Sequence, residues 1–475
     1  MGLSAMQIRT DIKPSLLLIS PHTSWDPVKR NMPSPPIGLW RIQGYIQKKI
    51  NAKIEIYDPW YSDKKIEEIC ESRPWSVIGV SILNDSLPQD LDNINIAKRS
   101  NPKALILAGG IEATTNYQTI LDHSLADGVI LGYGEKPLER ILSGENLPVP
   151  GMVLRTYAEE INEEDFNDFW QTYPVEEIPF AIYWQRAKEL RKEAGFSGAF
   201  RIVDVSHCNR RCIFCSISAL GAIASGKECL PVRMVSPEVV IELILKAVST
   251  IPELKVIYSV SDDFLTDWER AAKILTFTSQ CHDTRHLIWL VQSSIPRITY
   301  ERIRELAQYN VKHLTLGLES FIPRILKLIH KEQNPEEIYN IVQWCREFGI
   351  EPYILVILFF PMMTYKELRT TYEGLKTLQI MGAEISIEPY VRPYPKTLIS
   401  LQHEGETQFD LHTDYLRNSY RINKTLIPKD PKVKEIFLAF QKRYEDYQAT
   451  SEGHDFKGGI SKTIIDILGQ CLGRI

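Results

Sequence analysis

Residues 1–145 alternate short apolar runs with segments whose apolar residues recur every three or four positions. The apolar runs predict strands, and the segment at 38–50 predicts a helix. Continuous apolar strands separated by helices are typical of a parallel sheet that is covered on both faces. We therefore expect a Rossmann-like domain over 1–145, which binds ligands beyond the carboxyl ends of its strands. The expected strands cover residues 15–20, 53–58, 77–82, 104–110 and 128–134.

The same alternation resumes at residue 199 and predicts six further strand–helix repeats. Six repeats indicate a partial (β/α)6 barrel over 197–400, with functional loops at the carboxyl ends of its strands. The intervening residues, 146–196, contain a Pro-bearing turn and an acidic stretch and are interpreted as a linker. Residues 401–475 are polar and predict a mainly helical segment. The fold class is α/β.

Composition narrows the class of protein. The chain has 475 residues, 44% hydrophobic and 24% charged, with a net charge of −5, so nothing indicates a nucleic-acid-binding protein. No apolar run approaches the ~20 residues that span a bilayer, and the N-terminus lacks the features of a signal peptide. We therefore expect a cytoplasmic protein without a membrane partner.

Three of the eight cysteines lie within a single loop. Cys208, Cys212 and Cys215 have the spacing C-x3-C-x2-C at the end of a predicted strand. Three thiolates on a 4Fe–4S cluster leave one iron without a protein ligand, where chemistry can occur. A structural zinc ion needs four ligands, usually in two separated pairs, and no second pair follows here. Unrelated buried thiols are the remaining alternative, and the intervening Asn-Arg-Arg sequence fits it poorly.

This loop resembles the signature of the radical S-adenosylmethionine (SAM) superfamily, including the aromatic Phe214 just before the third cysteine. The resemblance implies that SAM binds the open iron and that an external one-electron donor, such as flavodoxin or ferredoxin, drives its cleavage to a 5′-deoxyadenosyl radical. Other strand ends resemble family segments. The resemblance implies SAM contacts from Phe214, Asp262, Asp263, Gln292, Ser293 and Glu319. For any one of the polar contacts, a loop cap or surface ion pair is an equal alternative.

The N-terminal region resembles the cobalamin-binding domain that precedes many radical SAM barrels. The matching segments are 33–40, 81–86, 107–114, 131–137, 150–155 and 177–184. Glycines let the backbone approach a large ring, and hydroxyls can bind its amides or tail. The resemblance implies cobalamin contacts from Ser81, Ser86, Gly109, Gly110, Thr114, Gly132, Gly134 and Glu135. The alternative is that these glycines only form tight turns in an empty Rossmann domain.

The D-x-H-x-x-G sequence that supplies a histidine ligand to cobalt in many cobalamin proteins is absent, since His123 falls one place too early. The resemblance thus implies cobalamin bound without a histidine below the cobalt. The leading hypothesis is a cobalamin-dependent radical SAM methyltransferase acting on an unactivated carbon of a small, natural-product-like substrate. The alternatives are a radical SAM dehydration, rearrangement or cyclisation enzyme with cobalamin idle or absent, and a non-catalytic cluster or cobalamin sensor.

Overall fold

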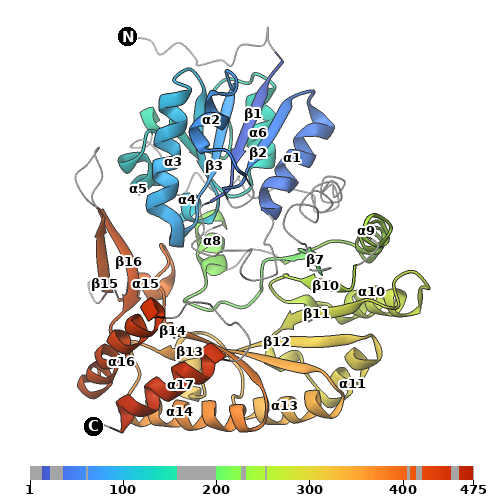
Figure 1. Ribbon diagram of the computed structural model, residues 1–475, viewed down its shortest axis with the longest axis vertical. Helices are drawn as coiled ribbons and strands as arrows, with labels where there is room; N and C mark the ends of the chain where they lie inside the picture. Colours follow the sequence, from blue (N-terminus) through green and yellow to red (C-terminus); the bar gives the residue numbers. More distant parts are fainter. Residues whose placement is uncertain are drawn as a thin grey trace.

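The computed structural model contains two six-stranded sheets, one above the other in Figure 1. It describes residues 13–21, 36–59, 62–157, 199–225, 232–251, 254–403, 407–412, 420–450 and 459–473. The expected segment at 177–184 and the first part of 33–40 lie outside these residues.

The N-terminal sheet has the strand order β2-β1-β3-β4-β5-β6. Its strands are β1 (Ser15–Ile19), β2 (Lys53–Tyr57), β3 (Val77–Ser81), β4 (Leu105–Gly109), β5 (Gly128–Ile130) and β6 (Met152–Leu154). The first five strands pair in parallel, as the apolar runs predicted. β6 pairs antiparallel with β5 and extends the sheet into residues that were expected to be linker. Its three residues are too short a run to stand out as a strand in the sequence.

Helices cover both faces of the N-terminal sheet, because successive strand residues point to opposite sides. Leu16 and Leu18 of β1 pack in one apolar cluster with α1 and α6, whereas Leu17 and Ile19 pack in another with α2, α3 and α5. The helices are α1 (Ile37–Lys49), α2 (Ile66–Glu71), α3 (Leu87–Ser100), α4 (Ile111–Thr115), α5 (Tyr117–His123) and α6 (Glu135–Leu142). This is the doubly covered, Rossmann-like architecture expected from the sequence.

The second sheet is wholly parallel, with the order β14-β13-β12-β11-β10-β7. Its strands are β7 (Ala199–Ile202), β10 (Val256–Ser259), β11 (Ile288–Ser293), β12 (Val311–Glu319), β13 (Glu351–Phe359) and β14 (Glu384–Tyr390). All six expected strands are therefore present and form the partial barrel. A short antiparallel pair, β8 (Val205–Ser206) and β9 (Arg233–Met234), follows β7.

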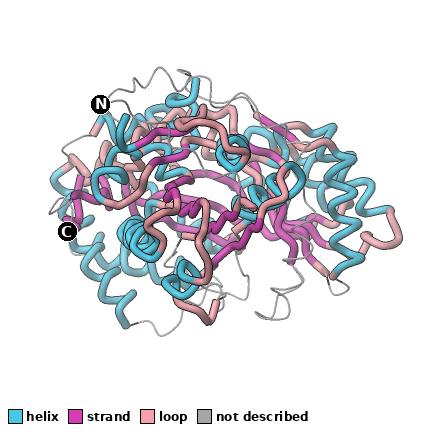
Figure 2. Tube along the Cα trace, turned by 90° about the horizontal axis from the view of Figure 1, so that it is seen from above, coloured by secondary structure: helices cyan, strands magenta, loops and turns pink. Residues whose placement is uncertain are grey.

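Helices line the outer side of this sheet in Figure 1, and the view from above in Figure 2 shows strands running through the middle of the molecule. Helix α8 (Ser216–Ser225) instead lies between the two halves, where it packs against α4. The outer helices are α9 (Pro237–Thr250), α10 (Trp268–Gln280), α11 (Tyr300–Gln308), α12 (Pro323–Leu328), α13 (Glu337–Glu347) and α14 (Tyr365–Ile380). Their inward residues and the strands form one large apolar core.

The C-terminal segment extends this core past the last strand. It comprises α15 (Leu398–Gln402), the antiparallel hairpin β15 (Thr407–His412) and β16 (Tyr420–Leu426), α16 (Pro431–Thr450) and α17 (Gly459–Leu472). Phe437 and Phe440 of α16 each lie 5.4 Å, centroid to centroid, from Phe359 at the end of β13. The segment is mainly helical, as expected. The hairpin was not expected, because its polar sequence carries little of the apolar alternation that marks a strand.

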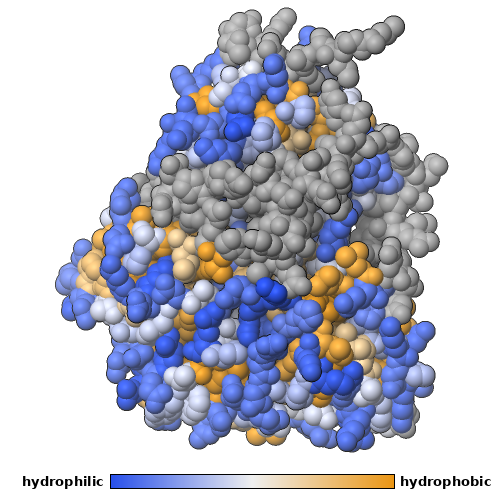
Figure 3. All heavy atoms as spheres, turned by 180° about the vertical axis from the view of Figure 1, so that it is seen from behind, coloured by the Kyte–Doolittle hydropathy of each residue, from blue (hydrophilic) through white to orange (hydrophobic). Residues whose placement is uncertain are grey.

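Polar side chains dominate the described surface of the second sheet's half in the view from behind, with apolar side chains in separate groups (Figure 3). Among the described residues, no helix has both the length and the hydropathy needed to span a bilayer.

Candidate active site

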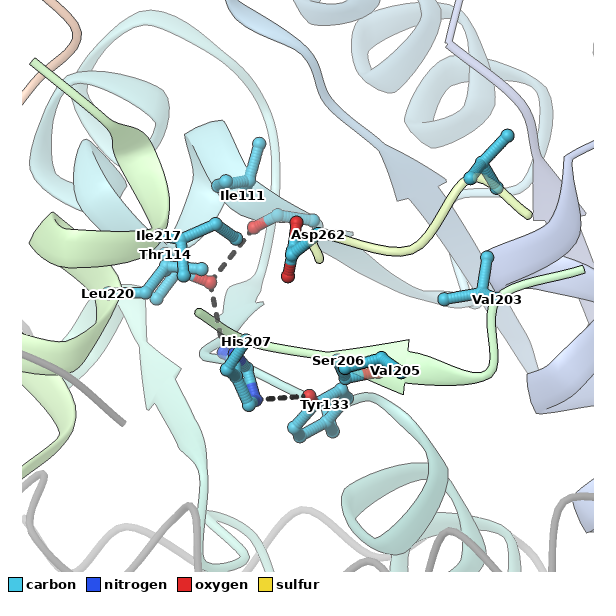
Figure 4. Close-up of a pocket in the computed structure, with 13 residues that line it drawn as sticks. Ile111, Thr114, Tyr133, Val203, Val205, Ser206, His207, Ile217, Leu220 and Asp262 are labelled. Atoms are coloured by element: carbon cyan, nitrogen blue, oxygen red, sulfur yellow. Dashed lines mark hydrogen bonds between the residues drawn. The ribbon is translucent and has the colours of Figure 1, made fainter. Parts of the chain in front are cut away.

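A cavity of about 220 Å³ lies where the carboxyl ends of the two sheets meet (Figure 4). The N-terminal half contributes turns that follow β4 and β5, and the barrel contributes residues that follow β7 and β10. Both halves therefore supply the walls of one site. The lining residues are Gly110, Ile111, Thr114, Gly132, Tyr133, Val203, Val205, Ser206, His207, Ile217, Leu220, Val260 and Asp262.

Two glycine turns form the N-terminal wall, and Thr114 ties them together. Gly110 and Gly132 have φ angles of 100° and 71°, in the region that favours glycine. The Thr114 hydroxyl donates to the Gly110 carbonyl at 2.9 Å and accepts from the Gly132 N–H at 2.9 Å. Thr114 is thus positioned to fix the spacing of the two turns.

The backbone at Gly109 is open on the side where a side chain would stand. No heavy atom lies within 4 Å of the place where a Cβ on Gly109 would stand. A Cβ on Gly110, by contrast, would lie 3.0 Å from the Ile82 carbonyl oxygen. The open backbone at Gly109 and the tight turn at Gly110 fit a group that approaches the chain closely, as cobalamin would.

The remaining residues expected at cobalamin lie deeper in the N-terminal half. A Cβ on Gly134 would meet Ile42 of α1 at 3.0 Å, and Glu135 is buried 3.6 Å from the Arg41 guanidinium. Burial raises the pKa of Glu135, and Arg41 opposes that shift. None of these side chains lines the cavity.

The two serines also have protein contacts. The Ser86 hydroxyl donates to buried Asp90 at 2.7 Å. The Ser81 oxygen lies 3.3 Å from the place of a Cβ on Gly110, so it borders the same turn. Their contact with cobalamin stays a prediction.

The three cysteines lie in a compact loop between β8 and α8. His207, just before Cys208, has a φ of 68°, which turns the chain sharply out of the strand. The Cys215 N–H donates to the Cys212 carbonyl at 3.1 Å, and the Arg210 N–H donates to the Cys208 sulfur at 3.5 Å. Cys212 is buried, and the other two thiols are partly exposed.

The surroundings of the thiols offset part of the cost that burial places on the thiolate form. Burial raises the pKa of all three thiols, to about 11 for Cys215. Backbone N–H groups at the start of α8 oppose this shift for Cys215, and Lys331 opposes it for Cys208 and Cys212. Hydrogen-bond donors and a buried cation around desolvated sulfurs stabilise negative charge, which a thiolate-bound cluster carries.

A cubane cluster needs its thiolates farther apart than a single metal ion does, because each thiolate binds a separate iron. Across the described ranges, no three His, Cys, Asp or Glu side chains converge closely enough to hold one metal ion. The donor set at the cysteine loop fits a cluster held by Cys208, Cys212 and Cys215.

A buried polar network, which the sequence did not reveal, supports the strand end before the cysteines. Asp204 accepts hydrogen bonds from Ser259 at 2.9 Å, Ser261 at 2.5 Å and Arg270 at 2.7 Å. The Ser261 oxygen in turn accepts from the Asp204 and Val205 N–H groups. The network joins β7, β10 and α10 and fixes where the cysteine loop begins.

Two of the residues expected to contact SAM, Asp262 and Asp263, occupy different positions. Asp262 lines the cavity and accepts a hydrogen bond from the His207 N–H, and burial raises the pKa of its carboxyl. Asp263 is buried and accepts from Ser293 at 2.7 Å and Arg297 at 2.8 Å. Two neighbouring residues that were expected to act alike therefore point into different environments.

The other SAM candidates also have defined partners. The Gln292 side-chain amide donates to the Ser261 carbonyl. Phe214 is partly buried and packs against the barrel core. Their contact with SAM stays a prediction, as it does for Asp262, Asp263 and Ser293.

Glu319 forms a buried ion pair with Lys331, 2.9 Å between Oε1 and Nζ. The two residues are 9% and 8% exposed. Glu319 and His330 have φ angles of 61° and 55°, which are costly for residues other than glycine. A Cβ on Gly317 would lie 2.6 Å from the Glu319 oxygen and 2.7 Å from the lysine nitrogen, so glycine makes room for the pair.

Hydrogen bonds on both sides of Lys331 hold its segment against the cysteine loop. The Ile213 N–H donates to the Ile329 carbonyl at 3.2 Å, and the Arg210 guanidinium donates to the Glu332 carbonyl at 3.1 Å. The buried charge of Lys331 is therefore held beside the thiols. Nothing in the sequence marked this lysine, which follows an ordinary helix.

Comparisons with known proteins agree with this site. Residues 202–375 match the family model of the radical SAM superfamily, and residues 28–142 match that of the B12 binding domain. The chain is a radical SAM enzyme that carries a B12 binding domain, so the expected combination is confirmed. Its cofactors are a 4Fe–4S cluster, SAM and cobalamin.

The chain is also similar to three individual proteins. A protein of Pyrococcus horikoshii described as an uncharacterized methyltransferase is 25% identical over 393 residues, which cover 80% of this chain and 81% of the relative. The structure of the radical SAM methyltransferase TsrM of Kitasatospora setae, with cobalamin and a 4Fe–4S cluster bound, is similar at a TM-score of 0.65 and 13% identity. The match covers 98% of this chain and 100% of the TsrM chain. The structure of the cobalamin-dependent SAM radical enzyme OxsB, with aqua-cobalamin bound, is similar at a TM-score of 0.68 and 15% identity. The match covers 92% of this chain and 67% of the OxsB chain. The structural likenesses establish the fold.

We expect replacement of Cys208, Cys212 and Cys215 together by Ala to abolish cluster assembly, because each thiol supplies one cluster ligand. Iron analysis after anaerobic reconstitution should fall from about four irons per chain to almost none, with loss of the iron–sulfur absorbance. Cys70→Ser and Cys345→Ala are the controls. Both thiols are buried in apolar cores, Cys70 on α2 and Cys345 on α13, so iron content should not change. Iron retained in the triple variant would contradict the ligand assignment.

We expect the buried ion pair to shift the midpoint potential of the cluster in opposite directions when either partner is neutralised. Lys331→Met removes a cation beside the thiols and should lower the potential, because reduction adds negative charge. Glu319→Gln should raise it. Redox titration followed by electron paramagnetic resonance (EPR) measures both, with Lys327→Met on the exposed face of α12 as the control. Shifts of the same sign in both variants would show that they act through distortion of the loop instead.

Proposed function

We propose that the chain is a C-methyltransferase that acts on an unactivated carbon of a small, natural-product-like molecule. The observation that supports this most directly is the shared cavity, whose walls come from the glycine turns of the B12 binding domain and from barrel residues on either side of the cysteine loop, His207 before it and Ile217 after it. A reaction that uses both cofactors on one substrate requires them to face the same space. The Pyrococcus relative described as a methyltransferase points the same way.

When bound, the three cofactors supply a carbon radical and a transferable methyl group. The chain's own residues hold them and exclude water. Cys208, Cys212 and Cys215 would hold the cluster, and Asp262 would bind the ammonium end of SAM. The open backbone at Gly109, with the turns at Gly110 and Gly132, would receive cobalamin.

The cavity wall indicates the kind of substrate. Apolar side chains from both halves, among them Ile111, Val205, Ile217 and Val260, surround a few polar groups. Apolar walls contribute no exchangeable hydrogen-bonding groups near a reactive radical and favour a small substrate with an exposed carbon skeleton. An external one-electron donor, such as flavodoxin or ferredoxin, and a cytoplasmic location complete the proposal.

Methyl transfer can be followed with SAM that carries an isotope label in its methyl group. The expected result is a methylated small molecule that contains the label, formed together with 5′-deoxyadenosine under reducing, anaerobic conditions with cobalamin. Mass spectrometry of reactions with and without cobalamin provides the measurement. Formation of 5′-deoxyadenosine and an unlabelled, rearranged or dehydrated product would favour a different radical reaction and overturn the proposal.

The place of cobalamin can be tested by filling the space at Gly109. We expect Gly109→Trp to weaken hydroxocobalamin binding at least tenfold in an absorbance titration, because the indole would occupy open space beside the turn. Gly109→Ala is the matched control and should bind nearly as wild type does. Iron content should be unchanged in both variants. Equal binding by the Trp variant would show that cobalamin does not contact this turn.

A further inference from the structure

A hydrogen bond in the wall of the cavity joins the two halves of the chain. The Tyr133 hydroxyl lies 2.6 Å from Nε2 of His207, with the two rings edge to face at 5.9 Å and 67°. Figure 4 shows the pair in the wall of the cavity, drawn with its hydrogen bond. His207 is 5% exposed, so the bond is shielded from water, where such contacts are stronger.

Each partner is one residue away from a turn that belongs to a cofactor site. Tyr133 directly follows Gly132, and His207 directly precedes Cys208. Gly132 and His207 both have left-handed backbone angles, 71° and 68°. A displacement of the glycine turn would therefore reach the cysteine loop through one side-chain contact, without a flexible segment between them.

Each member of the pair also contacts a neighbouring charged side chain in its own half of the chain. The Arg41 guanidinium lies 5.8 Å from the centre of the Tyr133 ring, and Glu135 lies 3.6 Å from Arg41. On the barrel side, the His207 N–H donates to the Asp262 carboxyl. The bond thus connects two anchored elements, which is the arrangement that transmits a displacement instead of absorbing it.

Apolar packing beside the pair keeps the two surfaces in contact. Leu220 and Ile217 of α8 pack with Ile111 of α4 and with the Tyr133 ring. α8 begins directly after Cys215, so this contact also joins the cysteine loop to the B12 binding domain. Loss of the hydroxyl alone would leave the packing of the ring in place.

We propose that Tyr133 and His207 are a positioning pair that couples cobalamin binding to SAM binding at the cluster. Cobalamin held at the glycine turns fixes the Tyr133 hydroxyl, which fixes His207 and the start of the cysteine loop. SAM then binds a loop that is already ordered, so its affinity rises. The inference requires cobalamin to bind but does not depend on methyl transfer.

The test measures SAM affinity with and without cobalamin. Anaerobically reconstituted full-length protein is titrated calorimetrically with SAM, in the absence and presence of saturating hydroxocobalamin. For the wild type we expect cobalamin to tighten SAM binding by at least about fivefold, the lower range of typical coupling. Because coupling is reciprocal, SAM must tighten hydroxocobalamin binding by the same factor.

Tyr133→Phe removes only the hydroxyl and should reduce the coupling factor to less than about twofold. His207→Asn removes the bond from the other side with a residue that tolerates the left-handed backbone but is too short to reach Tyr133. The double variant should lose no more coupling than either single variant, because all three remove the same bond. Tyr300→Phe is the matched control, since it removes a phenol hydrogen bond of 2.8 Å to Glu347 on the outer surface, and its coupling should equal that of the wild type.

A spectroscopic signal distinguishes positioning from simple loss of stability. Cobalamin should change the EPR spectrum of the reduced, SAM-bound cluster in the wild type and in Tyr300→Phe, but not in Tyr133→Phe. Wild-type coupling in both Tyr133→Phe and His207→Asn would overturn the inference, as would a wild type that binds both ligands without coupling. Coupling together with an unlabelled product would support the inference and overturn only the methyltransferase proposal.

Discussion

The site depends on one constraint, which is that the parallel strands of the two sheets present their carboxyl ends to each other. Parallel strands end at one edge, and the turns at that edge are free to bind ligands because the helices occupy the faces. Here the turns after β4 and β5 face those after β7 and β10 across a single cavity. Each half alone would offer an open edge to solvent. Together they form the two walls of one cavity.

Buried charge does much of the positioning around this cavity. Asp204, Asp263 and Glu319 are buried carboxylates, and each has a cationic partner, Arg270, Arg297 or Lys331. An ion pair in the interior contributes little net stability, because desolvation offsets the attraction, but breaking it is costly. Such pairs specify one arrangement of the strand ends. Asp262, beside Asp263, is the exception that faces the cavity, which suits a role in binding a ligand.

The features that the sequence predicted are those with a local signal. Continuous apolar runs located eleven strands of the two sheets, and the three-cysteine spacing identified the radical SAM loop. The glycine pairs located the turns, but their separate roles depend on neighbours distant in sequence. Gly109 faces open space, whereas Gly134 faces Ile42 of α1. β6, the β15–β16 hairpin and Lys331 escaped prediction for the same reason, since short or polar segments acquire their role only from long-range contacts.

Two polar contacts between the halves oppose a rotation that one contact alone would allow. Tyr133 meets His207 at the turn after β5, while Asp85, in the loop after β3, pairs with Arg392 beyond β14 at 2.5 Å. These contacts involve the first and last parts of the barrel. A single contact would act as a pivot and allow the halves to rotate, whereas two separated contacts oppose that rotation. Arg392 also pairs with Glu388 at 3.1 Å, which anchors it to the last strand. The relative orientation of the glycine turns and the cysteine loop is therefore specified at both ends of the partial barrel, and a rotation that widens the distance between them must break at least one of these contacts.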